Sequence, residues 1–216
     1  MKAVITGATG SVGNGLVSEL LENGYEVLVL TRGNSNRNKN IPVNCNVRIC
    51  SCSLEELGGF DTEDGNKYDI FFHLAWKGTT GIERNDIDIQ MSNVSYTMDA
   101  VKLAERLGCH TFVGIGSQAE YGKVNTRISS DTLCNPQSAY GAAKLSASHL
   151  SRVLADQKSM RHVWVRLLTV YGPYDGAGFV APTIRTVHMG KIPKFTKGEQ
   201  IWDFLYYKNS LKSCLP

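Results

Sequence analysis

The chain has 216 residues, of which 42% are hydrophobic and 20% are charged, with a formal net charge of +3. This is the composition of an ordinary globular protein, so it excludes an intrinsically disordered chain. The net charge is too small for a nucleic-acid-binding protein, and no apolar run approaches the roughly 20 residues of a membrane-spanning helix.

The N-terminus leads straight into an apolar segment and carries no secretory leader pattern. We therefore expect a cytoplasmic protein with reduced cysteines and with no nucleic-acid or membrane partner. Cys50 and Cys52 have the wrong spacing for a C-x-x-C zinc motif, so no metal is expected.

The first predicted elements are a strand over residues 2–6 and a helix over residues 11–23, which carries apolar residues at helical spacing. The turn between them has glycines three residues apart. Glycines let backbone amides approach an anion, and a helix N-terminus favours a diphosphate. A turn that serves backbone geometry alone is the alternative interpretation. The residues assigned to a dinucleotide are Gly7, Thr9, Gly10, Ser11, Val12 and Gly13.

The chain then alternates strands with helices. We predict further strands at 26–31, 47–50, 70–74, 111–115 and 163–168, and further helices at 89–107 and 139–155. Polar segments at 33–46 and 79–86 are predicted loops, and residues 54–57 a short helical turn. The alternation indicates a doubly wound parallel sheet, which is a Rossmann-type α/β fold with its ligand at the carboxyl ends of the strands.

The pattern loosens after Pro173, where we predict a loop over 174–180, a helix over 182–189 and a strand over 201–206. We therefore expect a dinucleotide-binding domain over residues 1–170 and a small, incomplete substrate-binding lobe over residues 171–216.

A second motif lies in the helix predicted at 139–155, where Tyr140 and Lys144 are four residues apart and share one helix face. Ser117 ends the strand predicted just before it. This order suits carbonyl reduction, because a lysine charge lowers the pKa of a phenol and a serine hydroxyl polarises the substrate oxygen. An ordinary buried tyrosine beside a surface lysine is the alternative.

These motifs resemble those of the extended short-chain dehydrogenase/reductases, also called NAD-dependent epimerase/dehydratases. The resemblance covers nearly the whole chain, in family order. Its further motifs are Phe72-His73-Leu74-Ala75, Asn93-Val94, Ser117 to Gly122, Asn135 to Tyr140, Arg166, Val170-Tyr171-Gly172-Pro173 and Trp202 to Tyr206.

The resemblance implies catalytic roles for Ser117, Tyr140 and Lys144, with Asn93 in support. Tyr140 and Lys144 would also contact the cofactor, as would Leu74, Ala75 and Asn93. The implied substrate is a nucleotide sugar. The residues expected to contact this substrate are Ser117, Gln118, Arg185 and Trp202.

The second predicted strand ends in Thr31 and Arg32, with no carboxylate to bind a ribose 2′-hydroxyl. Arg37 follows in the next loop, and a guanidinium suits a 2′-phosphate. We therefore expect NADP, with NAD as the second choice; an exposed Arg32 stacked on adenine is the alternative.

Dehydratases of this family usually carry Asp-Glu directly after the catalytic serine or threonine, where this chain has Gln118 and Ala119. Glu120, if it lies in an extended segment, would point to the other side. Dehydration is therefore disfavoured, and a 4-keto-sugar reductase and a 4-epimerase both stay open. A catalytically impaired dinucleotide-binding module with a regulatory or scaffolding role is the alternative from another class.

Relatives often dimerise through the two helices that correspond here to 89–107 and 139–155, so we expect a homodimer in which apolar residues such as Val94, Met98, Val101 and Leu107 contribute.

Relatives also usually continue well beyond the segment resembling 202–206, whereas this chain ends at Pro216. We therefore expect an open sugar pocket, with measurable cofactor binding but weak sugar-nucleotide binding and slow or absent turnover. A compact relative with a small lid is the alternative.

Overall fold

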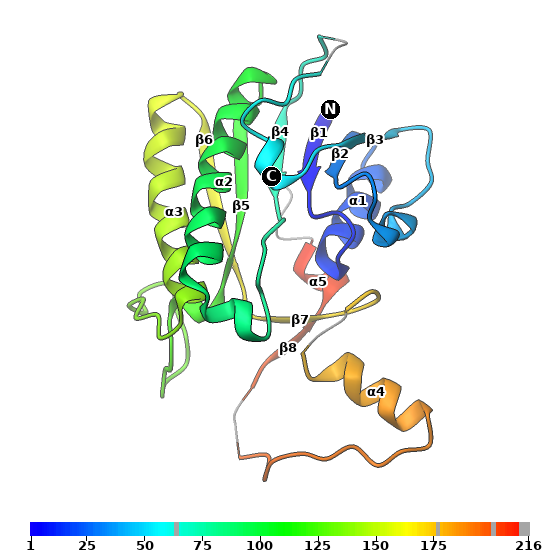
Figure 1. Cartoon of the computed structure of the whole chain (residues 1–216), viewed down its shortest axis with the longest axis vertical. Helices are drawn as coiled ribbons and strands as arrows, with labels where there is room; N and C mark the ends of the chain where they lie inside the picture. The colour runs from blue at the N-terminus through cyan, green and yellow to red at the C-terminus, as the bar shows by residue number, and fades with distance from the viewer. Residues whose placement is uncertain (63–64, 176–177, 200–201, 212–216) are drawn as a thin grey trace.

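A computed structural model describes residues 1–62, 65–175, 178–199 and 202–211 (Figure 1). Its main sheet has six parallel strands in the order β3-β2-β1-β4-β5-β6. The strands are β1 (Lys2–Thr6), β2 (Glu26–Thr31), β3 (Val47–Ser51), β4 (Ile70–His73), β5 (Thr111–Ser117) and β6 (Arg161–Leu167). This is the Rossmann strand order, so the predicted fold class is confirmed.

Helices cover both faces of this sheet, as Figure 1 shows. Helix α1 (Ser11–Glu22) packs the buried Leu16 and Leu20 against alternate residues of β1, β2 and β4. On the other face, α2 (Ile87–Arg106) and α3 (Ala139–Gln157) pack against each other and against a core that contains Phe71 and Phe112. The predicted helices therefore exist, with ends that differ by one or two residues.

A crevice for a ligand lies where the strand order reverses. Strand β1 pairs with β2 on one side and with β4 on the other, and the chain leaves β2 and β4 in opposite directions across the sheet. In such sheets, ligands bind at the carboxyl ends of the strands beside this point. The glycine turn follows β1 there.

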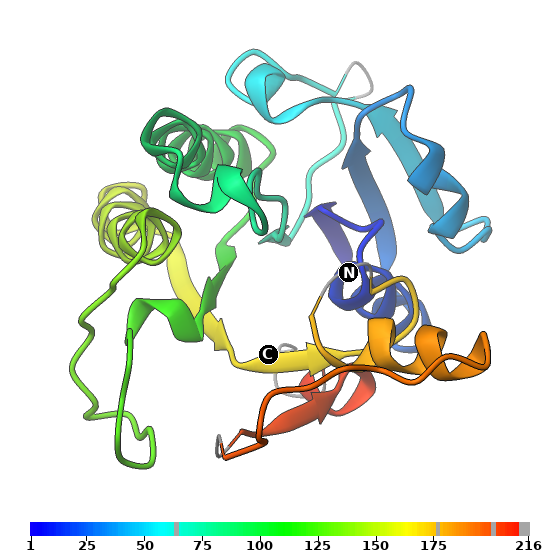
Figure 2. The same ribbon diagram turned by 60° about the horizontal axis from the view of Figure 1, so that its bottom comes forward.

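The chain after β6 forms a separate small sheet of two parallel strands, β7 (Thr169–Tyr171) and β8 (Phe204–Tyr206). Helix α4 (Val180–His188) lies between them in sequence, and α5 (Tyr207–Leu211) follows and contacts α1. Figure 2 shows β7 and β8 crossing beneath the main sheet, with α4 at one side.

Several local predictions need correction. The sequence pattern did not predict β7, and the strand predicted at 201–206 begins at Phe204, while residue 201 lies outside the described residues. Both predicted polar loops contain 3₁₀ turns, η1 (Asn36–Asn40) and η3 (Ile82–Asn85). The side chain of Ser35 caps η1 by accepting a hydrogen bond from the Arg37 amide, whereas η3 follows Gly81, which has a φ of +66°. The end of the tail, at 212–216, also lies outside the described residues.

In the part that the structure describes, no helix is long and apolar enough to cross a membrane.

Candidate functional site

The glycine turn after β1 packs directly against the segment that follows β4. Gly7 has a φ of +79°, and a Cβ atom there would lie 2.7 Å from the Ala75 backbone nitrogen. A Cβ atom on Gly13 would clash with the carbonyl of Gly7, so both positions require glycine. The structure therefore brings the predicted turn residues together with Leu74 and Ala75.

A cavity of about 670 Å³ opens beside this turn, at the carboxyl ends of β1, β2 and β4. Of the predicted cofactor residues, it is lined by Gly7, Thr9, Gly10, Thr31, Arg32, Leu74 and Ala75. Its position at the switch point of a Rossmann sheet is that of a dinucleotide site.

The N-terminus of α1 offers unused hydrogen-bonding capacity at this cavity. Gly10 is the N-cap and supplies no side-chain bond to the first amides of the helix. Ser11 Oγ is buried and has no hydrogen-bond partner among the described residues. Ser11 is not among the residues that line the cavity, but Gly10 is, and the backbone amides of a helix N-terminus satisfy a phosphate. The start of α1 therefore fits the diphosphate of a dinucleotide. Val12, by contrast, packs against the core beneath α1.

The end of β2 is organised by asparagine side chains. Asn38 accepts a hydrogen bond from Thr31 Oγ1 at 2.9 Å and donates one to the Arg32 carbonyl at 2.9 Å. Arg37 Nη2 donates to the Thr9 carbonyl at 3.3 Å, so this guanidinium reaches the glycine turn from the second loop. Arg32 and Arg37 thus both line the cavity.

The segment after β4 is fixed by two buried amides of α2. Asn93 accepts a hydrogen bond from the Lys77 amide at 2.8 Å and donates to the Lys77 carbonyl at 3.0 Å. Gln90 accepts from Trp76 Nε1 at 2.9 Å and donates to the carbonyls of Gly78 and Glu83. Asn93 therefore holds the loop that borders the cavity. Sequence reasoning missed Gln90, although a polar residue one helical turn before Asn93 was a usable signal.

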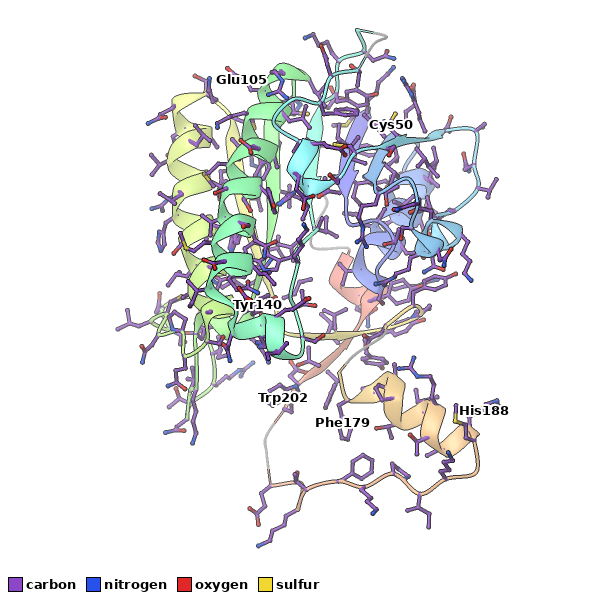
Figure 3. The ribbon with its side chains drawn as sticks, viewed as in Figure 1. Cys50, Glu105, Tyr140, Phe179, His188 and Trp202 are labelled. Carbon is purple, nitrogen blue, oxygen red and sulfur yellow. The ribbon has the colours of Figure 1, made fainter. Side chains whose placement is uncertain are left out.

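The predicted catalytic residues meet at the carboxyl end of β5. Ser117 is the last residue of β5, and Ser138 caps α3 by accepting a hydrogen bond from the Gly141 amide at 3.1 Å. Tyr140 and Lys144 consequently lie in the first two turns of α3, facing the sheet and almost completely buried. Figure 3 places Tyr140 at the end of the sheet nearer to Phe179 and Trp202, and Glu105 at the opposite end.

Burial controls the ionisation of both titratable residues. The Lys144 ammonium donates to the Ile115 carbonyl at 2.7 Å and lies 3.6 Å from the centre of the Trp76 ring. Burial lowers the pKa of Lys144 to about 7, with the charge of Glu120 opposing the shift. Burial also raises the pKa of Tyr140, although Ser117 and Arg84 act to lower it. The expected lowering of the Tyr140 pKa by Lys144 is therefore not what this arrangement produces.

Glu120 is placed by a 3₁₀ turn, η4 (Gln118–Glu120), and not by the extended segment that we expected. Its fully buried carboxylate accepts hydrogen bonds from the Ser117 amide at 2.8 Å, Trp164 Nε1 at 3.1 Å and Arg166 Nε at 2.6 Å. These three hydrogen bonds occupy the carboxylate, which therefore has a structural role behind Ser117.

A second cavity, of about 970 Å³, lies between the end of β5 and the small sheet. Gln118 and Trp202 line it, together with four aromatic side chains, Tyr171, Phe179, Phe195 and Phe204. Arg185 is not among the lining residues; it lies on α4 and donates to the Asp175 carbonyl at 3.2 Å. Of the four predicted substrate residues, Gln118 and Trp202 therefore line this cavity, Ser117 directly precedes Gln118, and Arg185 lies outside the lining.

No metal centre is found in the part of the chain that the structure describes, where acidic, histidine and cysteine side chains form no cluster of three. The site thus has two cavities, one at the glycine turn and one lined by aromatic side chains. Tyr140 and Lys144 contact Trp76, which lines the first cavity, and Ser117 precedes Gln118, which lines the second. This combination defines a dinucleotide-dependent enzyme of the Rossmann class.

Comparisons with known proteins give the family. The sequence profile of the NAD-dependent epimerase/dehydratase family matches residues 3–215. The chain therefore belongs to this family of enzymes.

Individual relatives are distant but align along the whole chain. An uncharacterised UDP-glucose epimerase of Bacillus subtilis, YtcB, is 26% identical over 98% of this chain and 71% of its own length. The dTDP-6-deoxy-L-talose 4-dehydrogenase (NAD(+)) of Aggregatibacter actinomycetemcomitans is 24% identical over 97% of this chain and 77% of its own length. The crystal structure of UDP-glucuronic acid 4-epimerase from Bacillus cereus in complex with NAD has a TM-score of 0.85 at 25% identity, over 99% of this chain and 71% of that one.

Proposed function

We propose that this protein is a nucleotide-sugar 4-epimerase or 4-keto-sugar reductase in which Ser117, Tyr140 and Lys144 carry out the proton exchange. The observation that carries the proposal is the position of these residues between the two cavities. Trp76, which lines the dinucleotide cavity, touches Tyr140 edge-on with ring centres 6.1 Å apart. Gln118, which lines the aromatic cavity, is the neighbour of Ser117.

The roles follow from the chemistry of each group. A bound nicotinamide would accept or supply the hydride. Ser117 would donate a hydrogen bond to the sugar oxygen, and Tyr140 would give its phenolic proton to that oxygen or take one from it. Lys144, held at the Ile115 carbonyl, would bind the nicotinamide ribose and keep the region positive. The aromatic cavity would hold the nucleotide, whose base can stack on Phe179 or Phe204.

Dehydration stays disfavoured under this proposal. Gln118 and Ala119 lack an ionisable group, and the carboxylate of Glu120 is bound to Arg166 and buried. An epimerase or a reductase needs only the proton-exchanging trio and the nicotinamide, which is why these two reactions are retained.

The reaction can be tested with a panel of 4-keto-sugar nucleotides and NADPH, following the loss of the reduced-nicotinamide absorbance. A reductase should consume NADPH in this assay, whereas an epimerase returns the hydride to the sugar and is followed instead by the interconversion of the two 4-epimers. Tyr140→Phe should abolish either activity and leave dinucleotide affinity nearly intact, because only the proton-exchanging oxygen is lost. Retention of most of the rate by Tyr140→Phe would rule out the proposed acid/base.

For the cofactor, the proposal favours NADP over NAD. The support is the absence of a carboxylate at Thr31 and Arg32 and the presence of Arg37 at the glycine turn. NADPH should bind more tightly than NADH, and Arg32→Ala should reduce the difference. Equal affinities in the starting protein would overturn this preference.

We also propose a homodimer formed through α2 and α3, with different contact residues from those first expected. Val94, Val101 and Leu107 are buried in the core of the chain and cannot form the interface. Large apolar side chains that remain exposed on these helices are Ile87, Met91, Leu150 and Val153.

A further inference from the structure

Arg84, a residue that no sequence motif singled out, lies on the ring of Tyr140. Its guanidinium carbon is 4.3 Å from the centre of the ring, which is within the range of a cation–π contact. Arg84 belongs to η3, in the segment between β4 and α2, and Tyr140 belongs to the first turn of α3. The fold therefore places a cation from one loop against the proposed acid/base on another element.

Several independent hydrogen bonds fix this placement. Arg84 Nη1 donates to the Thr79 carbonyl at 2.8 Å, which holds the guanidinium to its own loop. The next residue, Asn85, accepts a hydrogen bond from the Ala139 amide at 3.2 Å, which ties η3 to the start of α3. Gln90 donates to the Glu83 carbonyl at 3.0 Å from the other side. Arg84 is therefore held over Tyr140 by the surrounding structure.

The charges around Tyr140 give this placement a consequence. Lys144, on the same helix, is 6.0 Å from the Tyr140 ring, and its own pKa is lowered by burial to about 7. Burial therefore disfavours the charged form of Lys144. Glu120, on η4, acts on Tyr140 with a negative charge, and Ser117 acts to lower the pKa of Tyr140. The positive charge of Arg84 acts in the opposite direction to Glu120 and lowers the pKa of Tyr140.

We propose that Arg84 supplies the permanent positive charge that stabilises the Tyr140 phenolate when the phenolic proton moves to or from the substrate oxygen. Arg84 acts through Tyr140, so it is a positioning residue. The proton passes between the Tyr140 oxygen and the sugar oxygen, and Arg84 itself neither gains nor loses one. The role in turnover rests on the proposed function, whereas the effect on Tyr140 can be measured without a substrate.

The test is the ionisation of Tyr140 in the full chain, followed by ¹⁹F NMR after biosynthetic incorporation of fluorotyrosine. Fluorination lowers the pKa of each phenol and brings the titration into a range where the protein stays folded. The chain has 9 tyrosines, so the Tyr140 signal is assigned by its loss in Tyr140→Phe. An opposite charge within this distance lowers a pKa by about one unit or more.

Arg84→Met should therefore raise the pKa of Tyr140 by about one pH unit. Arg84→Lys should restore at least half of the difference, because it returns the charge without the planar stack. Arg152→Met is the matched control. Arg152 is exposed on α3, twelve residues beyond Tyr140, which places it about 18 Å away along the helix and beyond a Debye length. It should leave the Tyr140 titration unchanged.

An unchanged titration in Arg84→Met, or an equal shift in Arg152→Met, would overturn the proposal. If Arg84→Met does not fold, the comparison of Arg84→Gln with Arg84→Lys decides the question, since both keep a donor for the Thr79 carbonyl. In an active enzyme, loss of Arg84 should also move the base-dependent limb of the pH profile to higher pH. A chain that shows the titration shift but no turnover with any nucleotide sugar would contradict the proposed function and leave the assignment of Arg84 standing.

Discussion

Replacing Glu120 by Gln tests whether the buried carboxylate behind Ser117 anchors the site. Glu120 has no exposed side-chain surface and pairs with Arg166, whose side chain is 29% exposed. Removing one partner of a buried ion pair costs about 3–5 kcal/mol. Because Arg166 reaches solvent, we expect the lower value, a loss of about 3 kcal/mol in the free energy of unfolding.

The double variant Glu120→Gln with Arg166→Met makes the prediction sharper. When both charges are removed, no unpaired ion stays in the interior, so the double variant should be more stable than Glu120→Gln alone by at least about 1 kcal/mol. Measuring the single variant Arg166→Met as well completes a double-mutant cycle, which gives the coupling energy between these two residues in contact.

Urea unfolding followed by circular dichroism gives these free energies, and unchanged m-values would show that the unfolded state is comparable. Glu105→Gln is the control, since it breaks an exposed ion pair with Lys158 that is worth about 1 kcal/mol or less. A cost for Glu120→Gln no larger than that of Glu105→Gln would refute the anchoring argument.

Three further predictions concern the cofactor turn, acid stability and assembly. Gly7→Ala should lower the free energy of unfolding and abolish dinucleotide binding, because Gly7 has a φ of +79° and the added Cβ atom would press on the Ala75 backbone. If titration calorimetry showed that Gly7→Ala binds the dinucleotide with unchanged affinity, this prediction would be wrong. Burial lowers the pKa of His73 to about 3, so from pH 6.5 down to about 3 the unfolded chain takes up a proton that the native state does not. The free energy of unfolding should therefore fall in this window by up to about 1.4 kcal/mol per pH unit, and the slope should be shallower in His73→Gln; identical slopes in the two proteins would show that His73 contributes nothing. Light scattering should give the mass of a dimer, which Met91→Glu should convert to that of a monomer, whereas a monomer mass for the starting protein at micromolar concentration would exclude the dimer.

The backbone framework could be predicted because it depends on local patterns. The bounds of β1 and β2 agree with the prediction, since apolar runs between polar turns mark buried strands. The meeting of Ser117, Tyr140 and Lys144 also followed from spacing, since the end of one strand and the start of the next helix face the same edge of the sheet.

The support around the site could not be predicted, because it depends on partners far apart in the sequence. Glu120 and Arg166 are 46 residues apart, and only the folded sheet brings them together. The cation on Tyr140 likewise comes from a polar loop whose 3₁₀ turn carries no periodic signal. The ionisation of Lys144 went unpredicted for the same reason, since its burial under Trp76 depends on packing between elements.

The central claim is that Tyr140 exchanges a proton with a sugar hydroxyl while a hydride moves to a bound nicotinamide. The most direct measurement is a single-turnover mixture of the protein, oxidised dinucleotide and a panel of nucleotide sugars, following the absorbance band of reduced nicotinamide. The band should develop with the starting protein for at least one sugar and stay absent in Tyr140→Phe, whose dinucleotide affinity should be unchanged. Equal development of the band in both proteins, or no dinucleotide binding by either, would contradict the account.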